Sequence, residues 1–158
     1  MNSKINEGLR VCELFVTLDE KEMKSILDVL GPACETVDYK PGDHIFDQGE
    51  MSNKLYVIVS GQVVLQRTVN MGNKTTTWPL GLLGRGRAMG WSALLYGPRY
   101  STASATCQKA AQVIAIDGAR LRAALEANPV IGFKVMDKLA GMLGERLRAA
   151  YNTLDAHL

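Results

Sequence analysis

The region from residue 33 to residue 116 constrains the fold most, because it alternates short runs rich in Val, Ile, Thr and Leu with turns that contain glycine. Residues 54–59 and 62–69, for example, are two such runs separated only by Ser60 and Gly61. Short, evenly spaced strands with turns between them are typical of antiparallel barrels and sandwiches. We therefore expect a mainly β domain, with roughly eight strands in this region.

Helical patterns lie on both sides of the predicted strands. Upstream, four apolar residues fall on one face at helical spacing: Met23, Ile26, Leu27 and Leu30. Either Thr17 with Glu20 or Asp19 with Glu22 can form the capping box that starts this helix. The pair Gly31-Pro32 ends it.

Downstream of the strands, the pattern predicts a helix at 119–127 and a longer one from Pro129 to about Asp155, with Asn128 as its N-cap. The length of the chain suits one domain with a single core, spanning residues 1–158. Its expected parts are a helical N-terminus at 9–31, a barrel at 33–116 and C-terminal helices at 118–156.

The last predicted helix carries an apolar seam with alternating spacings of three and four residues: Phe133, Met136, Ala140, Leu143, Leu147, Ala150 and Leu154. A seam of this kind is typical of helices that pair with a partner helix. It is long compared with a small barrel, and Gly141 and Gly144 beside it would let another helix approach closely. We therefore expect a homodimer through this helix. The alternative is that the seam packs on the barrel of its own chain.

Composition narrows the classes of function. The 158 residues are 47% apolar, and the net charge of +2 is too even for the footprint of a nucleic-acid-binding surface. We expect a cytoplasmic protein without membrane contact, because the sequence has neither a bilayer-spanning apolar run nor the apolar stretch of a signal peptide.

Cys12, Cys34 and Cys107 are too scattered for a zinc or iron–sulfur site, so we expect no metal. No nucleophile–base pair stands out, and we do not expect an enzyme.

Three segments resemble parts of a known family. Residues 39–50 (YKPGDHIFDQGE) hold a Pro-Gly-Asp turn and a strand ending in Gly-Glu, 55–63 (LYVIVSGQV) hold a tyrosine-bearing strand and a glycine turn, and 90–103 (GWSALLYGPRYSTA) resemble a phosphate-binding cassette. Together they resemble the cyclic-nucleotide-binding domain family, and in particular its bacterial catabolite-activator (Crp/Fnr-like) branch, from about residue 9 to residue 147. The resemblance implies a double-stranded β-helix (jelly-roll) barrel with a ligand site inside it and a long C-terminal dimerisation helix.

The cassette contains the candidate ligand-binding residues: Gly90, Trp91, Ser92, Ala93, Arg99, Tyr100 and Ser101. Burying an anion such as a cyclic phosphate requires charge compensation. A short helix that begins near Trp91 offers free N–H groups, and Arg99 can make a forked contact with phosphate oxygens. Gly90 permits a close approach of the backbone. In the alternative interpretation, Arg99 is a surface arginine that caps a loop.

Trp91 stands where the resemblance implies a glutamate that accepts a hydrogen bond from the ribose 2′-hydroxyl. Tryptophan has one N–H donor and no acceptor. Losing a charge-assisted hydrogen bond of roughly 1.5–3 kcal/mol predicts about 10- to 150-fold weaker binding of cAMP or cGMP. Trp91 then either lines a site for a different ligand, such as a planar acid, or plugs the site. Among residues 149–151, only Tyr151 offers a side chain that can hydrogen-bond or stack on a purine.

The leading hypothesis is a regulatory module that senses a ligand at the anion site of residues 90–103. The expected ligand is a cyclic nucleotide or another phosphate-bearing or anionic small molecule, and the sequence requires no cofactor. Some members of the wider superfamily bind haem, but the sequence has no convincing pair of axial ligands. Two alternatives stay open: a ligand-free dimeric interaction scaffold, and the sensor half of a transcription regulator whose DNA-binding part is absent from this chain. Because the sequence ends at Leu158, we expect no recognition helix and no nucleic-acid binding by this chain alone.

Overall fold

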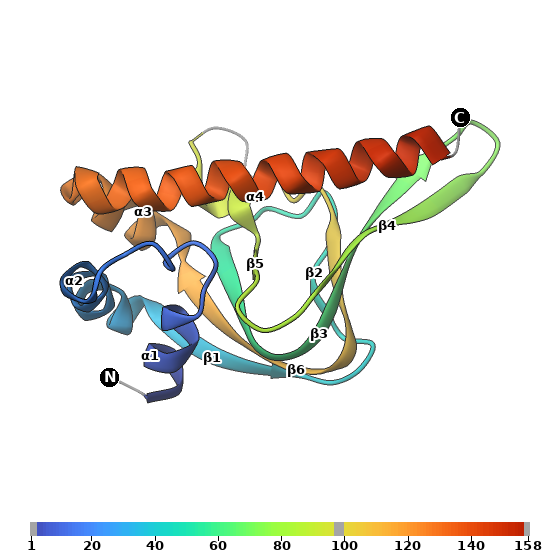
Figure 1. Ribbon diagram of the computed structural model, residues 1–158. Coiled ribbons are helices and arrows are strands. Elements are labelled where there is room, and N and C mark those ends of the chain that lie inside the picture. The colour runs from blue at the N-terminus through green and yellow to red at the C-terminus, as the bar shows by residue number, and fades with distance from the viewer. Residues whose placement is uncertain (1–2, 97–99, 157–158) are drawn as a thin grey trace.

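The computed structural model of the protein describes residues 3–96 and 100–156 (Figure 1). Its strands are β1 (Cys34–Tyr39), β2 (His44–Phe46), β3 (Lys54–Asn70), β4 (Thr75–Leu83), β5 (Ala88–Met89) and β6 (Ser104–Asp117). Its α-helices are α1 (Ser3–Arg10), α2 (Glu20–Leu30), α3 (Gly118–Ala127) and α4 (Pro129–Ala156), and two short 3₁₀ helices are η1 (Gly31–Ala33) and η2 (Trp91–Leu94). The predicted class, mainly β with flanking helices and a long C-terminal helix, is confirmed.

The strands form one antiparallel sheet that rolls around its own core. Its order is β1-β6-β3-β4, with β2 added on β6 and β5 on β3, so β1 and β4 are the two ends of the order. The described residues form six strands, fewer than the sequence suggested, because β3 and β6 each join two predicted runs. At the joint, Gly61 has a φ of 96°, and a Cβ there would lie 2.6 Å from the Ala111 Cα on the neighbouring strand. The register between β3 and β6 shifts on both sides of Gly61, so the two strands bend together and do not stop.

Side chains alternate between two cores on the two faces of this sheet. Leu55 and Val57 of β3 belong to a cluster with the helices, whereas Ile58 and Val63 belong to a second cluster inside the rolled sheet. The same division holds along β6, where Ile114 faces the helices. The alternation of side chains along β3 and β6 therefore buries both faces of the central strands.

The helices begin where local signals place them. The Asp19–Glu22 pair forms the capping box of α2, and of the two pairs considered this is the one whose reciprocal hydrogen bonds are present. Asn128 caps α4, since the Ile131 N–H donates to its side-chain oxygen at 3.4 Å. The N-terminal helical region begins earlier than expected, at Ser3, because α1 buries an apolar face against the sheet.

The helix α4 crosses above the sheet from the end near α3 towards the hairpin of β3 and β4 (Figure 1). It is anchored to the helical core by Ile131, Val135, Leu139 and Met142, all of which are buried. Beyond Met142 it runs over the open side of the rolled sheet. None of the helices in the described part of the chain, including α4, is both long and apolar enough to cross a membrane.

Candidate ligand cavity

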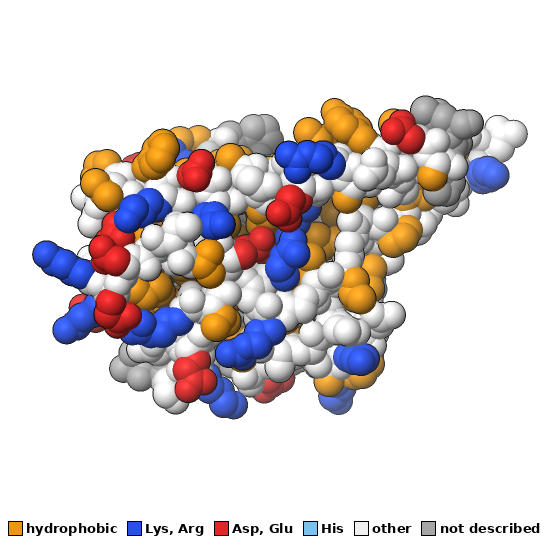
Figure 2. Space-filling model, in the orientation of Figure 1, with side chains coloured by type: hydrophobic (Ala, Val, Ile, Leu, Met, Phe, Trp, Pro, Cys, Tyr) orange, Lys and Arg blue, Asp and Glu red, His pale blue; other side chains and the backbone are white. Residues whose placement is uncertain are grey.

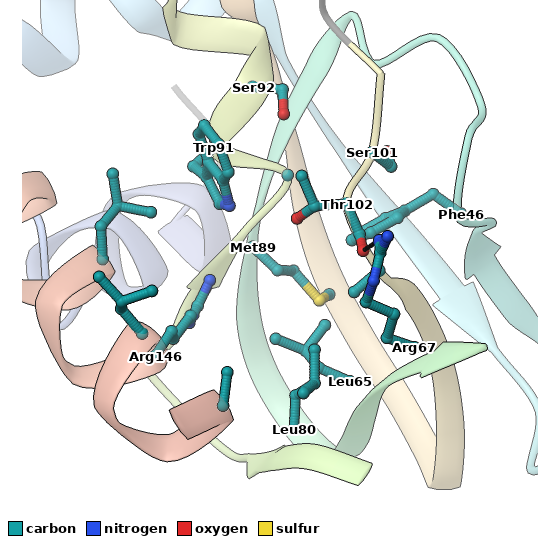
Figure 3. Close-up of a pocket in the computed structure, with 15 residues that line it drawn as sticks. Phe46, Leu65, Arg67, Leu80, Met89, Trp91, Ser92, Ser101, Thr102 and Arg146 are labelled. Atoms are coloured by element: carbon teal, nitrogen blue, oxygen red, sulfur yellow. Dashed lines mark hydrogen bonds between the residues drawn. The ribbon is translucent and has the colours of Figure 1, made fainter. Parts of the chain in front are cut away.

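A cavity of about 530 Å³ lies between α4, the rolled sheet and the cassette (Figure 3). Small-molecule sites in proteins typically measure about 300–1,000 Å³. Most of the lining side chains are apolar: Phe46, Leu65, Leu80, Met89, Trp91, Ala103, Leu143, Leu147 and Ala150. The polar lining side chains come from Arg67, Ser92, Ser101, Thr102 and Arg146. The space is thus mainly apolar, with two guanidinium groups at its boundary.

The cassette forms one wall of the cavity and starts at Gly90. This residue has a φ of 81° and is followed by the single turn of η2, in which the Ala93 N–H donates to the Gly90 carbonyl at 3.1 Å. A Cβ on Gly90 would lie 2.7 Å from the Lys54 carbonyl oxygen. Close packing of the cassette against β3 therefore requires glycine at this position. The short helix predicted near Trp91 is present.

The structure brings four of the seven candidate residues to the cavity: Gly90, Trp91, Ser92 and Ser101. Ala93 does not line it, because its side chain is buried against Gly118 at the start of α3. Tyr100 also points elsewhere: it is 56% exposed and forms an isolated β-bridge with Met51. Arg99 lies outside the described residues.

Trp91 forms part of the cavity wall and does not fill the cavity. Its indole is half-buried, packs against the helical core and still leaves the space beside it open. Ser92, the next residue, donates its hydroxyl to the Tyr100 carbonyl at 3.3 Å and ties the two ends of the cassette together. The Ser101 hydroxyl is buried without a hydrogen-bond partner among the described residues.

The fold, the cavity and the cassette can be compared with known proteins. The family model described as "Cyclic nucleotide-binding domain" matches residues 36–128. The chain belongs to this family. Among curated proteins, the "Cyclic AMP receptor protein" of Thermus thermophilus is 35% identical over 118 residues, which cover 74% of this chain and 50% of the relative. The "CRP-like cAMP-activated global transcriptional regulator" of Mycobacterium tuberculosis is 27% identical over 130 residues, covering 82% and 54%. This chain therefore spans about half the length of these relatives.

Solved structures agree on the fold. A cyclic nucleotide-binding domain from Methylobacillus flagellatus superposes with a TM-score of 0.76 at 18% identity, covering 99% of this chain and 83% of that one. The rolled sheet with a long helix across it is thus the architecture of the cyclic nucleotide-binding family. The resemblance seen in the three sequence segments is confirmed.

This family member carries an arginine on α4, Arg146, that sequence analysis missed. One of its terminal nitrogens donates to the Ala88 carbonyl and also lies 3.9 Å from a Glu13 carboxylate oxygen. Its Nε is buried and has no hydrogen-bond partner among the described residues. Burial lowers the pKa of the guanidinium, while Glu13 acts in the opposite direction. Arg146 therefore presents a buried donor at the edge of the cavity.

Glu13, in the segment between α1 and α2, contacts Arg87 and Ala88 as well as Arg146. The same carboxylate oxygen accepts hydrogen bonds from Arg87 Nε at 3.0 Å and from the Ala88 N–H at 2.6 Å. Arg87 also lies 3.7 Å from Glu145 on α4. The network holds α4 against the strand that leads into the cassette.

Arg67 of β3 is the second cation that sequence analysis missed. Its Nη1 donates to the Thr102 carbonyl at 2.6 Å, on the far side of the cavity from Arg146 (Figure 3). Both arginines could have been found from periodicity. Arg67 follows Leu65 at the two-residue spacing of a strand face, and Arg146 follows Leu143 at the three-residue spacing of a helix face.

The predicted dimer seam divides between two environments. Leu143, Leu147 and Ala150 line the cavity, and Met136 and Leu143 pack against the core of their own chain. The outward row of the seam, to which Leu147 also belongs, is exposed: Phe133, Ala140, Leu147 and Leu154. Figure 2 shows hydrophobic side chains along the edge that α4 forms. Tyr151, whose side chain could hydrogen-bond or stack on a purine, is exposed and does not line the cavity.

Proposed function

We propose that this domain is a ligand-sensing regulatory module in which α4 carries the signal from the cavity to a second copy of the chain. One observation carries the proposal. Leu147 lines the cavity and is also 52% exposed on the outward row of α4, so a ligand beneath it and a partner helix above it would contact the same residue. A ligand that binds the two arrangements of α4 differently shifts the population between them.

An open cavity favours this function over a ligand-free scaffold. A scaffold would fill the inside of the rolled sheet with side chains, as protein cores normally are. Here about 530 Å³ remains open between Trp91 and α4. The cassette of residues 90–103 supplies a glycine turn, a short helix start and hydroxyl groups to one wall. Arg146 extends from α4 towards this wall, and we assign the anion or phosphate contact to this end of the cavity.

Binding of cAMP and cGMP is weak in our proposal, because Trp91 replaces the acidic residue of the family cassette. The indole offers only a donor to a ribose hydroxyl, and its bulk takes space beside the cavity. Isothermal titration calorimetry with both nucleotides tests this point. We expect Trp91→Glu to bind cAMP about 10- to 150-fold more tightly than the unchanged protein.

Trp91→Phe is the matched control, since it keeps an aromatic wall without adding an acceptor, and its affinity for cAMP should stay as weak as that of the unchanged protein. Micromolar binding of cAMP by the unchanged protein would show that Trp91 does not weaken the site. If neither the unchanged protein nor Trp91→Glu bound cAMP, the cavity would have lost more than the ribose contact.

We also propose that the domain is a homodimer through the outward row of α4. Phe133 is 75% exposed and Leu154 is 40% exposed, and apolar side chains repeating along one helix face are typical of helix pairing. Phe133→Asp should convert a dimer to a monomer in sedimentation equilibrium. Val29→Asp on α2 replaces a similarly exposed apolar residue and should leave the mass unchanged. A monomeric unchanged protein would contradict the proposal.

A second candidate function is supported by the relatives. The two curated regulators are about twice the length that this chain matches, and both matches span only about half of them. This supports the sensor half of a transcription regulator as an alternative setting for the same ligand-sensing domain. The full reading frame of the gene decides between a stand-alone module and a sensor half.

Catalytic activity, cellular location and metal binding complete the proposal. We propose a binding module without catalytic activity, acting in the cytoplasm on a small-molecule ligand. The three cysteines are free thiols, as is usual in a reducing compartment. Among residues 3–96 and 100–156, no group of three or more His, Cys, Asp or Glu side chains is arranged to hold a metal ion.

A further inference from the structure

The polar side chains of the cavity are all donors or hydroxyl groups. Arg67 and Arg146 carry positive charge, and Ser92, Ser101 and Thr102 carry hydroxyls. Among the described lining residues there is no carboxylate and no side-chain amide. A cavity with this set favours a ligand with negative charge and offers few partners to a ligand with several hydroxyl or amide groups.

Arg146 has a donor that the protein itself leaves unused. Its Nε is buried and has no hydrogen-bond partner among the described residues, although one of its terminal nitrogens reaches the Ala88 carbonyl. Figure 3 shows the side chain extending from α4 towards Trp91. Nε itself is shielded from the cavity as well as from solvent, so an anion at this edge would meet the part of the guanidinium that lines the cavity, where a charge-assisted contact is favourable.

Arg67 provides positive charge across the cavity. It donates one hydrogen bond to the Thr102 carbonyl and forms no ion pair with any acidic residue of the described part of the chain. Arg146, by contrast, shares Glu13 with Arg87. Glu13 and Glu145 therefore offset the charge of Arg87 and Arg146 at one end of the cavity, whereas Arg67 at the other end has no carboxylate partner among the described residues.

The space between the two arginines is apolar. Met89 and Leu65 form a buried floor, with Leu80 beside them, and Trp91 closes one side (Figure 3). A flat, apolar body placed here would remove its own surface from water, together with the half-exposed surfaces of Leu80 and Trp91. The indole of Trp91 adds an aromatic face against which a second ring can pack.

The geometry points to a ligand that is an apolar, aromatic carboxylate, with the carboxylate at Arg146 and the ring between Met89 and Trp91. This inference rests on the proposed ligand-sensing function and names the chemical class of the ligand. A cyclic nucleotide is a poorer match, because its ribose 2′-hydroxyl and purine edge would meet an apolar floor and a donor-only indole.

A matched pair of probes tests the class directly. 2-Naphthoate and 2-naphthamide have the same ring system and nearly the same shape, and only the first is charged. In isothermal titration calorimetry on the unchanged protein, we expect naphthoate to bind at one site per chain and at least about tenfold more tightly than the amide, the factor expected of a charge-assisted hydrogen bond. Quenching of tryptophan emission that disappears in Trp91→Phe places the probe at this cavity, since Trp78 remains in that variant.

Variants of α4 assign the charge preference to one residue. Arg146→Met replaces the arginine by an unbranched, uncharged side chain of about the length of its aliphatic stem and should bring the affinities for naphthoate and naphthamide to within about threefold of each other. Arg148→Met removes an exposed arginine from the same helix and should retain the preference, which separates a contact from the general charge of the surface. Circular dichroism and thermal unfolding check that Arg146→Met is folded. If Arg146→Met is not folded, Arg146→Lys keeps the charge, and its preference for naphthoate should persist at a reduced level.

The outcomes that overturn the inference differ from those that overturn the proposed function. Equal affinity for naphthoate and naphthamide in the unchanged protein, or an unchanged preference in Arg146→Met, rejects the carboxylate class. Tighter binding of cAMP than of naphthoate, with the two competing, also rejects it but leaves the ligand-sensing function standing. If millimolar naphthoate, cAMP and cGMP all fail to bind, both proposals fail.

Discussion

Gly90 shows how one residue determines where the cassette can lie. Its φ of 81° is unfavourable for residues with a Cβ, and a Cβ would also meet the Lys54 carbonyl oxygen at 2.7 Å and the Tyr56 ring at 3.3 Å. The conformational constraint and the close contact both come from packing the start of η2 against β3. Any other residue at position 90 would push the cassette, and Trp91 with it, away from the sheet.

Gly90 and Gly72 have the same backbone conformation, so alanine at each position separates the cost of a positive φ from the cost of a close contact. Gly90→Ala should lower the free energy of unfolding by about 2–4 kcal/mol, since strain and a clash with backbone both act. Gly72 has a φ of 85°, but no atom lies within 4 Å of the place that an added methyl group would take, so Gly72→Ala should cost only about 1 kcal/mol. Urea unfolding measures both. Equal losses in the two variants would mean that the cassette moves away from Lys54 without cost.

At the residue scale, the sequence supports prediction of local features better than of partners. The glycine turn at 90 and the substitution at Trp91 could be recognised from neighbouring residues alone. Arg146 follows Leu143 on the cavity face of the helix, but its contacts with Glu13 and Ala88, which are distant in sequence, could not be predicted. Ala93 and Tyr100 were placed in the site by the motif, but packing against α3 and pairing with Met51 turn them away from it.

Two glycines of α4 lie in different surroundings. Gly132, near its start, packs against α3: a Cβ there would lie 2.5 Å from the Leu125 carbonyl oxygen. Gly141 lies near the middle of the helix and has nothing within 4 Å of the corresponding position. Gly132 is required for helix packing. Gly141 lowers the stability of the helix, and no contact within the described residues explains why a glycine stands there.

Alanine at these two positions should therefore have opposite effects. Gly141→Ala should raise the free energy of unfolding by about 0.5–1 kcal/mol through helix propensity, and Gly132→Ala should lower it by about 1–3 kcal/mol through overpacking against α3. Thermal unfolding at fixed protein concentration measures both. A destabilising Gly141→Ala would show that a partner helix approaches at that glycine.

At the scale of elements, helix boundaries were predictable and the number of strands was not. The capping box of Asp19 and the cap at Asn128 act within one turn of the helices they start, so the sequence contains them whole. The bend at Gly61, in contrast, is shared by β3 and β6, which are far apart in the chain. A glycine that looked like the turn of a hairpin is instead the point where two paired strands curve together.

At the scale of the whole molecule, the cavity and the outward row of α4 share a residue, so binding at one should affect binding at the other. Leu147 belongs to both, whereas Phe133 lies on the outward row alone. Ile131, Val135 and Leu139 anchor the first half of α4 in the helical core. Residues 143–150 cover the cavity and are held by Leu143 and by the contacts of Arg146. A ligand beneath this segment would fix it against the sheet and present the outward row in one position.

This predicts that ligand binding and dimerisation strengthen each other. With saturating 2-naphthoate, the dimer dissociation constant from sedimentation equilibrium should fall by at least about fivefold, the lower end of typical coupling between sites. In Phe133→Asp, which breaks the pairing without touching the cavity, the affinity for naphthoate at each site should fall by the square root of that factor, because two ligands bind per dimer and coupling between two binding equilibria is reciprocal. Val29→Asp should change neither constant. If naphthoate bound equally well to the monomeric variant and the unchanged dimer, α4 would cover the cavity without passing its state to the partner.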